Sequence, residues 1–444
     1  MLNGIWVALI LGAVVFGAIT GHLDAVAQAI TTSAAAAVTL AIGLVGVMAF
    51  FLGLMQVLQQ AGLLRLMAHA LRAPMRWLFP EVPADHPASG MMIMNIVSNM
   101  LGLGNAATPF GLKAMMELDR LNEHKGTASD AMITFLAVNT TGLAVLPSGI
   151  IGLRASLGST APASIFLTTW LSSITATAVA LVMVFLLRRL PRYRIVASAR
   201  VIERSAPTRD VDAEVEKAQA ALHIAPEPLP RGKAIVAYTV VLAVVGALGY
   251  GLAMMALGLG GRVPLGWPGA LKVAGRDWPL LLIVATFVLF GLVRGVKVYD
   301  AVVEGGKEGF QVAMRIIPFL VAMLVAVGML RASGAIDALA LLLNPLTSAV
   351  GLPAETLPMA LMRPLSGSGA FGIAAEIMKT HGPDSLIGQI VSTMQGSTET
   401  TFYVLALYYG VVRVKNTRYT LPACLVADLM GLFMAGWSCR LLLT

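Results

Sequence analysis

Long apolar runs, separated by short polar stretches, recur along the whole chain. The longest cover residues 6–19, 38–58, 165–187, 235–257, 280–293, 316–330 and 421–437. Several approach the ~20 residues that a helix needs to cross the apolar part of a bilayer. Only 12% of the 444 residues are charged, about half the usual share in soluble domains. The first run lacks a basic leader, which favours a retained helix over a cleaved signal peptide. The pattern predicts an all-α polytopic membrane protein.

The basic residues are unevenly distributed. The net charge is +8, and a group of arginines follows the apolar run 165–187, namely Arg188, Arg189, Arg192, Arg194, Arg200, Arg204 and Arg209. Such a cluster is typical of a cytoplasmic loop, with a specific anionic partner as the alternative. We therefore expect residues 191–232, which also contain several prolines, to form a cytoplasmic linker. No nucleic-acid partner is expected.

Two parts of the chain, residues 1–190 and 275–444, repeat one ordered series of short motifs. "NMLGLGNAATPFGLKAM" corresponds to "PLSGSGAFGIAAEIM", and "AVNTTGLAVLPSGIIGLR" corresponds to "STETTFYVLALYYGVVR". Each half predicts a membrane helix, an interfacial stretch with Asp24 or Asp300, a second helix, an amphipathic segment, two short apolar stretches, an interrupted helix and a final helix. One extra membrane helix, residues 233–258, lies between the halves. If each half crosses the membrane an even number of times, the one extra helix makes the second half enter from the opposite side, which predicts inverted topology. The alternative is that some short apolar stretches re-enter the membrane rather than span it.

Four polar interruptions of apolar segments stand at matching places in the two halves. Their candidate solute-binding residues are Asn95, Asn99, Gly102, Gly104, Asn105, Asn139, Thr140, Thr141, Arg363, Ser366, Gly367, Ser368, Gly369, Ser397, Thr398, Glu399 and Thr400. Breaks at membrane depth persist where protein shields them or where they line a wet cavity. Tight packing through small residues is the alternative. Gly102-x-Gly104 is no dinucleotide fingerprint, because no strand precedes it.

Glu399 is the strongest single signal, because an ionisable residue at the centre of a membrane helix costs about 2.5–3.5 kcal/mol on insertion scales. Arg363 is its expected partner. The two side chains could form a structural ion pair, or Glu399 could bind a proton, a cation or the solute; these interpretations are compatible. Asp428 is a second intramembrane acid, and we expect Glu399 and Asp428 to be candidates for ion coupling.

These motifs resemble a known family. Residues 1–190 resemble spore maturation protein A in "LFPEVPADHPASGMMIMNIVSNMLGLGNAATPFGLKAMMEL", and residues from about 275 onward resemble spore maturation protein B in "MRPLSGSGAFGI" and "IVSTMQGSTETTFYVLALYYG". The resemblance implies a fusion of the two, built from gate-type, or nucleoside-recognition, halves. It also implies a multi-pass protein of the bacterial cytoplasmic (inner) membrane.

The leading functional hypothesis is a secondary transporter for a small polar solute, which binds at the midplane between the halves. A proton or sodium ion would be the coupling ion, because no P-loop for ATP is present. The alternative is a non-transporting membrane scaffold that supports envelope or spore-type maturation. We expect no enzyme, since no catalytic triad order or zinc motif occurs, and we expect no cofactor and no metal. The expected partners are the lipid bilayer and a small polar solute. The sequence leaves open which solute it is and whether the chain forms a homo-oligomer.

Overall fold

The computed structural model is all-helical over the residues that it describes, which are 2–83, 86–102, 104–143, 147–193, 229–261, 263–336, 338, 341–342 and 351–443. Of the predicted linker, residues 194–228 lie outside this part. The helices are α1 (Leu2–Thr20), α2 (Leu23–Gln60), α3 (Leu63–Leu78), α4 (Pro87–Met100), α5 (Gly104–Leu121), α6 (Asp130–Thr140), α7 (Ser148–Ser156), α8 (Phe166–Leu187), η1 (Pro191–Tyr193), α10 (Arg231–Leu257), η2 (Leu259–Gly261), α11 (Gly266–Asp277), α12 (Pro279–Val293), α13 (Val298–Ala332), η3 (Ala354–Thr356), α15 (Leu357–Met362), α16 (Gly367–His381), α17 (Leu386–Ser397), α18 (Thr401–Val411) and α19 (Thr420–Leu443).

The prediction of an all-α membrane protein is confirmed. Among the described residues, 4 helices are long and apolar enough to cross a membrane, namely α2, α8, α10 and α19. The number rises to 6 if each of two bent pairs counts as one span. One pair is α11 with α12, bent by 71°, and the other is α13, bent by 44° between its two parts.

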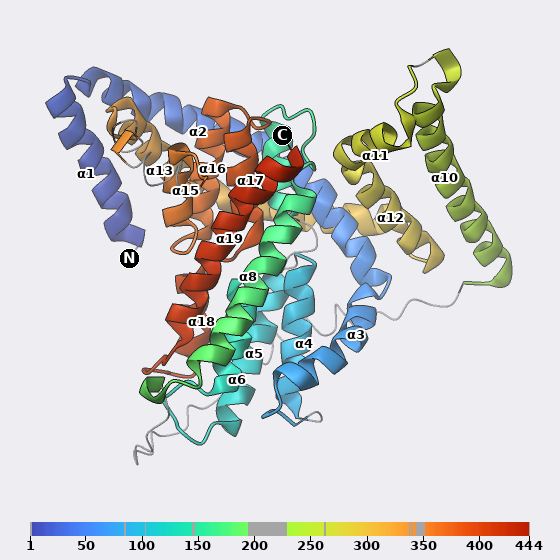
Figure 1. Ribbon diagram of the computed structural model, residues 1–444, viewed down its shortest axis with the longest axis horizontal. Helices are drawn as coiled ribbons and strands as arrows, with labels where there is room; N and C mark the ends of the chain where they lie inside the picture. Colours follow the sequence, from blue (N-terminus) through green and yellow to red (C-terminus); the bar gives the residue numbers. More distant parts are fainter. Residues whose placement is uncertain are drawn as a thin grey trace.

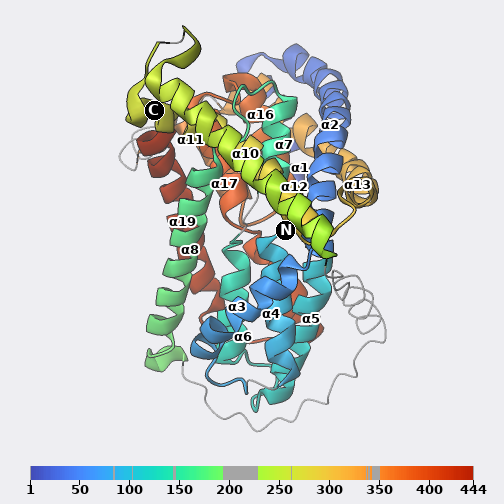
Figure 2. The same cartoon turned by 90° about the vertical axis from the view of Figure 1, so that its right-hand side faces the viewer.

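The two halves contain the same series of elements. A helical hairpin (α4–α5 or α15–α16) precedes a broken helix (α6–α7 or α17–α18), which precedes one long helix (α8 or α19). Figures 1 and 2 show α8 and α19 side by side, running from the upper to the lower part of the molecule. The amphipathic segment of the first half forms α3, which leads into the first hairpin.

Equivalent helices of the two halves run in opposite directions. Near the start of α8, Thr168 Oγ1 lies 2.9 Å from Thr393 Oγ1, which in turn lies 3.2 Å from Cys439 Sγ near the end of α19. Further along α8, Ser172 donates a hydrogen bond to the carbonyl of Gly431. The chain colours in Figure 1 show the same reversal. The predicted inverted repeat is therefore confirmed.

The long helices α2 and α13 cross at very close range outside the paired α8 and α19. A Cβ added to Gly305 would lie 2.5 Å from the carbonyl oxygen of Leu52, so only glycine fits there, as is common where membrane helices pack closely. Asp24 and Asp300 lie in the first turns of α2 and α13, where the helix dipole favours an acid. The residues after Asp24 continue into α2 without a break, whereas α13 bends by 44° between residues 298–312 and 317–332. The interfacial position of these first segments stays a prediction.

Helices α10, α11 and α12 form an arm at one side of the molecule (Figure 1). Of the residues of α10, only Ala237 and Ala256 are buried, and a helix that is apolar all round is suited to lipid. The arm is joined to α2 by Arg294, which directly follows α12. Its Nε donates to the carbonyl of Ala61 at 2.9 Å.

An ion pair, which we call the first clamp, joins the two halves at one end of the broken helices. The buried Arg154 of α7 places NH2 2.8 Å from Oδ1 of Asp384, just before α17. Burial by itself raises the pKa of Asp384. Hydrogen bonds from Ser159 and Thr160 and the charge of Arg154 outweigh that effect, so the pKa lies below its ordinary value of 3.8.

A second clamp joins the halves at the opposite end. NH1 of Arg418, just before α19, lies 2.6 Å from Oδ1 of Asp130 in the first turn of α6. Tyr419 Oη donates to the same oxygen at 2.8 Å. Beside them, the N–H of Ala128 donates to the carbonyl of Asn416. In both clamps, an arginine of one half holds the acid at the start of the other half's broken helix.

The first clamp predicts a pH-dependent loss of stability for Asp384→Asn. At pH 7 the variant should lose about 3 kcal/mol, because the buried Arg154 loses its counter-charge. The folded-state pKa of Asp384 is lowered, so its contribution is complete above the ordinary value of 3.8 and is lost as the pH falls through the folded pKa. The difference between wild type and variant should therefore shrink below pH 3.8.

Unfolding of the purified proteins in detergent, followed by circular dichroism across this pH range, measures the effect. Asp24→Asn removes an exposed acid as the matched control and should change stability by less than about 0.5 kcal/mol. A difference for Asp384→Asn that stays constant at low pH would contradict the assignment.

Candidate functional site

The four helix breaks meet between the two halves. The N–H of Glu399, in the α17–α18 break, donates to the carbonyl of Thr140 at the end of α6 at 2.8 Å. Three residues on, the N–H of Phe402 donates to the carbonyl of Pro364 at the tip of the α15–α16 hairpin at 3.0 Å. The remaining hairpin joins through Asn99 of α4, as described below. The breaks that the sequence places at matching positions thus contact one another in space.

This meeting point lies halfway along the long helices. A Cβ on Gly431 would lie 3.0 Å from Cγ2 of Thr398 and 3.1 Å from Cβ of Ala176. Gly431 is near the middle of α19, and Ala176 is near the middle of α8. Both helices are long enough to cross a bilayer, so the breaks lie near the middle of two candidate membrane spans.

Local chemistry explains why the first broken helix opens where it does. Gly142 has φ +51°, and a Cβ there would lie 2.9 Å from Cγ of Glu399. Only glycine meets both conditions without strain. Ser173 of α8 donates to the carbonyls of Thr141 at 3.3 Å and Gly142 at 3.1 Å. These bonds satisfy backbone groups that the missing helical turn leaves free.

Two charged side chains face each other at the crossing. Arg363, at the end of α15, is 4% exposed, and its NH2 lies 3.9 Å from Oε2 of Glu399. The side chain of Glu399 is 55% exposed, whereas its neighbours Thr398 and Thr400 are buried. The Nε of Arg363 has no hydrogen-bond partner among the described residues. The pair is therefore loose and leaves both groups capacity to bind something else.

Asp428 of α19 forms the third charge of this cluster. It is 2% exposed, and its Oδ2 accepts a hydrogen bond from Oγ1 of Thr401 at 2.6 Å. No described residue donates to its Oδ1. Asp428, like Glu399, lies close enough to the buried guanidinium of Arg363 for an electrostatic interaction.

Four of the candidate hydroxyl groups already form hydrogen bonds with backbone groups three residues away along the chain. They belong to Thr140, Thr141, Ser366 and Ser397. The Ser366 hydroxyl caps α16 by accepting from the N–H of Gly369 at 3.0 Å. A Cβ on Gly369 would press on that hydroxyl at 3.0 Å, and one on Gly367 would lie 2.9 Å from Thr400 Oγ1. The second Gly-x-Gly thus serves close approach and capping, and Ser368 between its glycines is half-buried.

Other candidate residues form a polar wall from the first half. Asn99 Nδ2 donates to Oδ1 of Asn139 at 2.8 Å, and Asn95 Nδ2 donates to the carbonyl of Ala107 at 2.8 Å. Three buried oxygens near the breaks have no hydrogen-bond partner among the described residues, namely Asn95 Oδ1, Ser98 Oγ and Thr398 Oγ1. Buried polar atoms in native proteins are nearly always paired, so these three oxygens are open positions in the hydrogen bonding around the breaks.

The tip of the first hairpin is only partly described. Gly102 has φ +72°, consistent with a sharp turn that requires glycine. Gly104 and Asn105 lie in the first turn of α5, and the side chain of Asn105 is outside the described part of the structure. Among the residues that are described, no group of three histidine, cysteine or acidic side chains is placed to hold a metal ion.

Two residues that hydrogen-bond to the predicted site residues were not themselves predicted. Tyr408 of α18 accepts a hydrogen bond from Asn95 at 3.0 Å, and its ring stacks on Phe135 at 6.0 Å. Thr177 of α8 donates to the Thr141 hydroxyl at 2.9 Å. The sequence does contain a signal for each: Tyr408 stands in the apolar run "VLALYYGVV", and Thr177 stands in "SSITATAVA". A phenol or hydroxyl buried in such a run needs a hydrogen-bond partner.

Gly142→Ala tests the contact between the two breaks. The new Cβ adds left-handed strain of about 1–2 kcal/mol and overpacks Glu399 by about a further 1–3 kcal/mol. Gly158→Ala is the matched control, because Gly158 also has positive φ (+81°) but has nothing within 4 Å of the added Cβ. Unfolding in detergent should show a larger loss for Gly142→Ala; equal losses would contradict the contact.

Comparison with known proteins gives the family. The gate family model, described as nucleoside recognition, matches residues 41–157 and 313–415, and these two segments contain all four breaks. Spore maturation protein B of Bacillus subtilis (strain 168) is 49% identical over 34% of this chain and 84% of its own length. Spore maturation protein A of the same organism is 42% identical over 37% of this chain and 84% of its own length. No solved structure matches the chain. The chain therefore belongs to the family of spore maturation proteins A and B, membrane proteins with nucleoside-recognition gate segments.

Proposed function

We propose that this protein is a secondary transporter that moves a small polar solute across the bacterial cytoplasmic membrane. One observation carries the proposal: the two broken helices meet through the hydrogen bond from the Glu399 N–H to the Thr140 carbonyl, and the exposed carboxylate of Glu399 lies at that crossing. Inverted repeats with discontinuous helices at the midplane are the architecture of many secondary transporters.

The chemistry of the site suggests the kind of solute. The carboxylate of Glu399 can accept hydrogen bonds, the guanidinium of Arg363 can donate them, and Asn95 in the first half has an unpaired side-chain oxygen. A solute that carries both donors and acceptors would use these groups together. The family description names nucleoside recognition, and nucleosides have such a mixture of groups. They are therefore the first class to test, followed by amino acids and small carboxylates.

The charge count suggests ion coupling. Arg363 balances only one of the two carboxylates, Glu399 and Asp428, and an unbalanced charge at membrane depth is costly. A proton or a sodium ion on one carboxylate would balance the second charge. A solute gradient or an ion gradient would then drive transport, and the proposal assigns no catalytic step.

A second candidate function is a non-transporting scaffold, as the spore maturation relatives allow. The two clamps favour it, because Arg154–Asp384 and Arg418–Asp130 tie the halves together at both ends. In a scaffold, Arg363 and Glu399 would form only a structural pair.

Glu399→Gln in proteoliposomes separates the two candidates. A thermal-shift screen of nucleosides, amino acids, small carboxylates and cations on the purified wild-type chain first identifies the solute. The variant should then remain monodisperse, lose at least tenfold in coupled uptake, and lose the thermal shift produced by the solute. Those losses follow because glutamine keeps the size of the side chain but cannot be ionised.

Glu376→Gln is the matched control, since Glu376 also faces an arginine, Arg331 at 3.7 Å, away from the breaks. It should retain uptake. Unchanged uptake by Glu399→Gln would remove Glu399 from the mechanism. Arg363→Ala that unfolds unless Glu399 is also neutralised would favour the scaffold.

A further inference from the structure

Helix α3 carries an unusual arrangement of exposed side chains. One face packs on the protein through residues such as Leu64 and Met75. A second face presents a basic stripe, formed by Arg65, His69, Arg72 and Arg76, and all four side chains are exposed. The spacing of four, three and four residues places them along one side of the helix.

An exposed apolar stripe runs beside the basic one. It consists of Leu66, Ala70, Ala73 and Trp77, at the same spacing and shifted by one residue. Leu66 is 64% exposed and Trp77 is 80% exposed. Water does not favour the apolar stripe, and the bilayer interior does not favour the basic one. The boundary between headgroups and acyl chains suits both, and tryptophan is enriched at that depth.

The basic stripe has no counter-charge of its own. The sequence of α3 contains no acidic residue. Over the described part of the chain, no ion pair forms with Arg65, Arg72 or Arg76. Exposed surface helices elsewhere in the chain mix the two signs, as in α13, where Lys307 pairs with Glu304 at 2.9 Å. No residue in the described part of the chain therefore supplies a counter-charge to α3 by an ion pair, which leaves its arginines available to an anionic group from outside.

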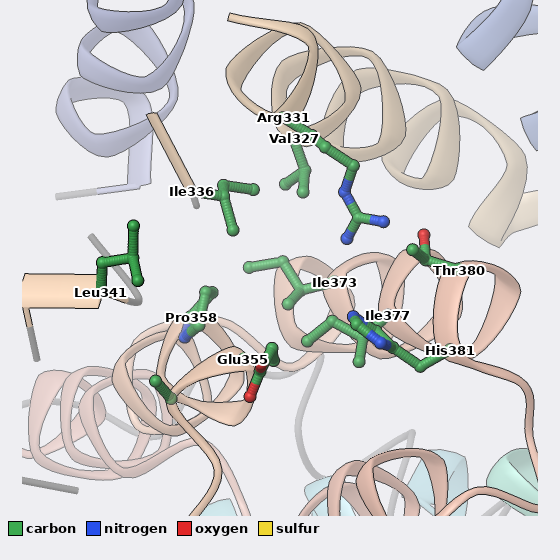
Figure 3. Close-up of a pocket in the computed structure, with 11 residues that line it drawn as sticks. Val327, Arg331, Ile336, Leu341, Glu355, Pro358, Ile373, Ile377, Thr380 and His381 are labelled. Carbon is green, nitrogen blue, oxygen red and sulfur yellow. The ribbon is translucent and has the colours of Figure 1, made fainter. Parts of the chain in front are cut away.

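The start of α3 lies level with the end of a membrane segment. Ala61, just before α3, accepts the hydrogen bond from Arg294, the residue that directly follows the apolar helix α12. Figure 1 shows α3 extending downward from about the level of the lower tips of α10 and α12. A cavity of about 550 Å³, lined by residues of α13, α15 and α16 (Figure 3), lies elsewhere and lacks such a stripe.

The geometry points to α3 as a surface that binds the headgroups of anionic phospholipids, with its basic stripe on the phosphates and its apolar stripe among the upper acyl chains. Because α3 connects α2 to the α4–α5 hairpin, lipid bound there would hold the entry to the first half's hairpin at the membrane surface. This inference does not depend on transport.

Quenching of Trp77 by brominated lipids tests it. The full chain and its Trp77→Phe variant are placed in phosphatidylcholine vesicles that contain brominated phosphatidylglycerol or, in parallel, brominated phosphatidylcholine. The difference between the two proteins isolates the fluorescence of Trp77. We expect stronger quenching by phosphatidylglycerol, and a preference that weakens when salt is raised about tenfold.

Two sets of variants check the basic stripe. Each arginine near an anionic surface contributes about fivefold in affinity, so Arg65→Gln, Arg72→Gln and Arg76→Gln together should abolish the preference of Trp77 quenching for phosphatidylglycerol. Lysine at the same three positions keeps the charge and should retain most of that preference. Arg192→Gln, Arg413→Gln and Lys415→Gln together remove the same charge from another exposed region and should leave the preference intact.

Two results would overturn the inference. If neither brominated lipid quenches Trp77, α3 faces water or another protein. If both lipids quench equally and salt has no effect, the contact is only apolar. The salt measurement uses the wild-type chain, so it decides the matter even if the glutamine variant does not fold.

Discussion

Backbone hydrogen bonding inside the membrane is the constraint on which this structure depends. A helix that opens at membrane depth leaves N–H and C=O groups with no water to satisfy them. Here each opening is satisfied by another part of the protein: Glu399 N–H by the Thr140 carbonyl, and the carbonyls of Thr141 and Gly142 by Ser173. The second half's broken helix takes this partner from the first half, whereas the carbonyls of the first half's break are satisfied by its own helix α8.

The same arrangement decides where charge can be placed. Arg363 comes from the hairpin tip, Glu399 from the broken helix and Asp428 from the long helix, so three separate elements of one half must pack before the cluster exists. The first half contributes neutral amides, Asn95, Asn99 and Asn139. The repeated scaffold therefore carries two different chemistries, and the ionisable one belongs to the second half.

Elements outside the crossing hold it in place. The clamps fix the ends of the two broken helices, while the Gly305 contact brings α2 and α13 together. The arm α10–α12 contacts this frame at Arg294 and Ala61. Polar interactions are concentrated at the ends and the centre of the molecule, and apolar packing fills the space between them.

The sequence by itself determined the class of protein, the internal repeat, the inversion and the position of all four breaks. Hydropathy and glycine, asparagine or threonine within apolar runs are local signals, and a membrane makes them strong because each break must be compensated. Glu399 and Arg363 also stood out in the sequence as ionisable residues within apolar segments, although the sequence could not give the 3.9 Å separation of their side chains.

Only the tertiary structure decided which breaks touch, that Tyr408 supports Asn95, and that Arg154 and Arg418 form matching clamps. These contacts join residues more than 200 positions apart. It also placed Asp24 and Asp300 in the first turns of the long helices α2 and α13. Local pattern sets where a helix can open, but the partner that satisfies the opening depends on how the two halves pack.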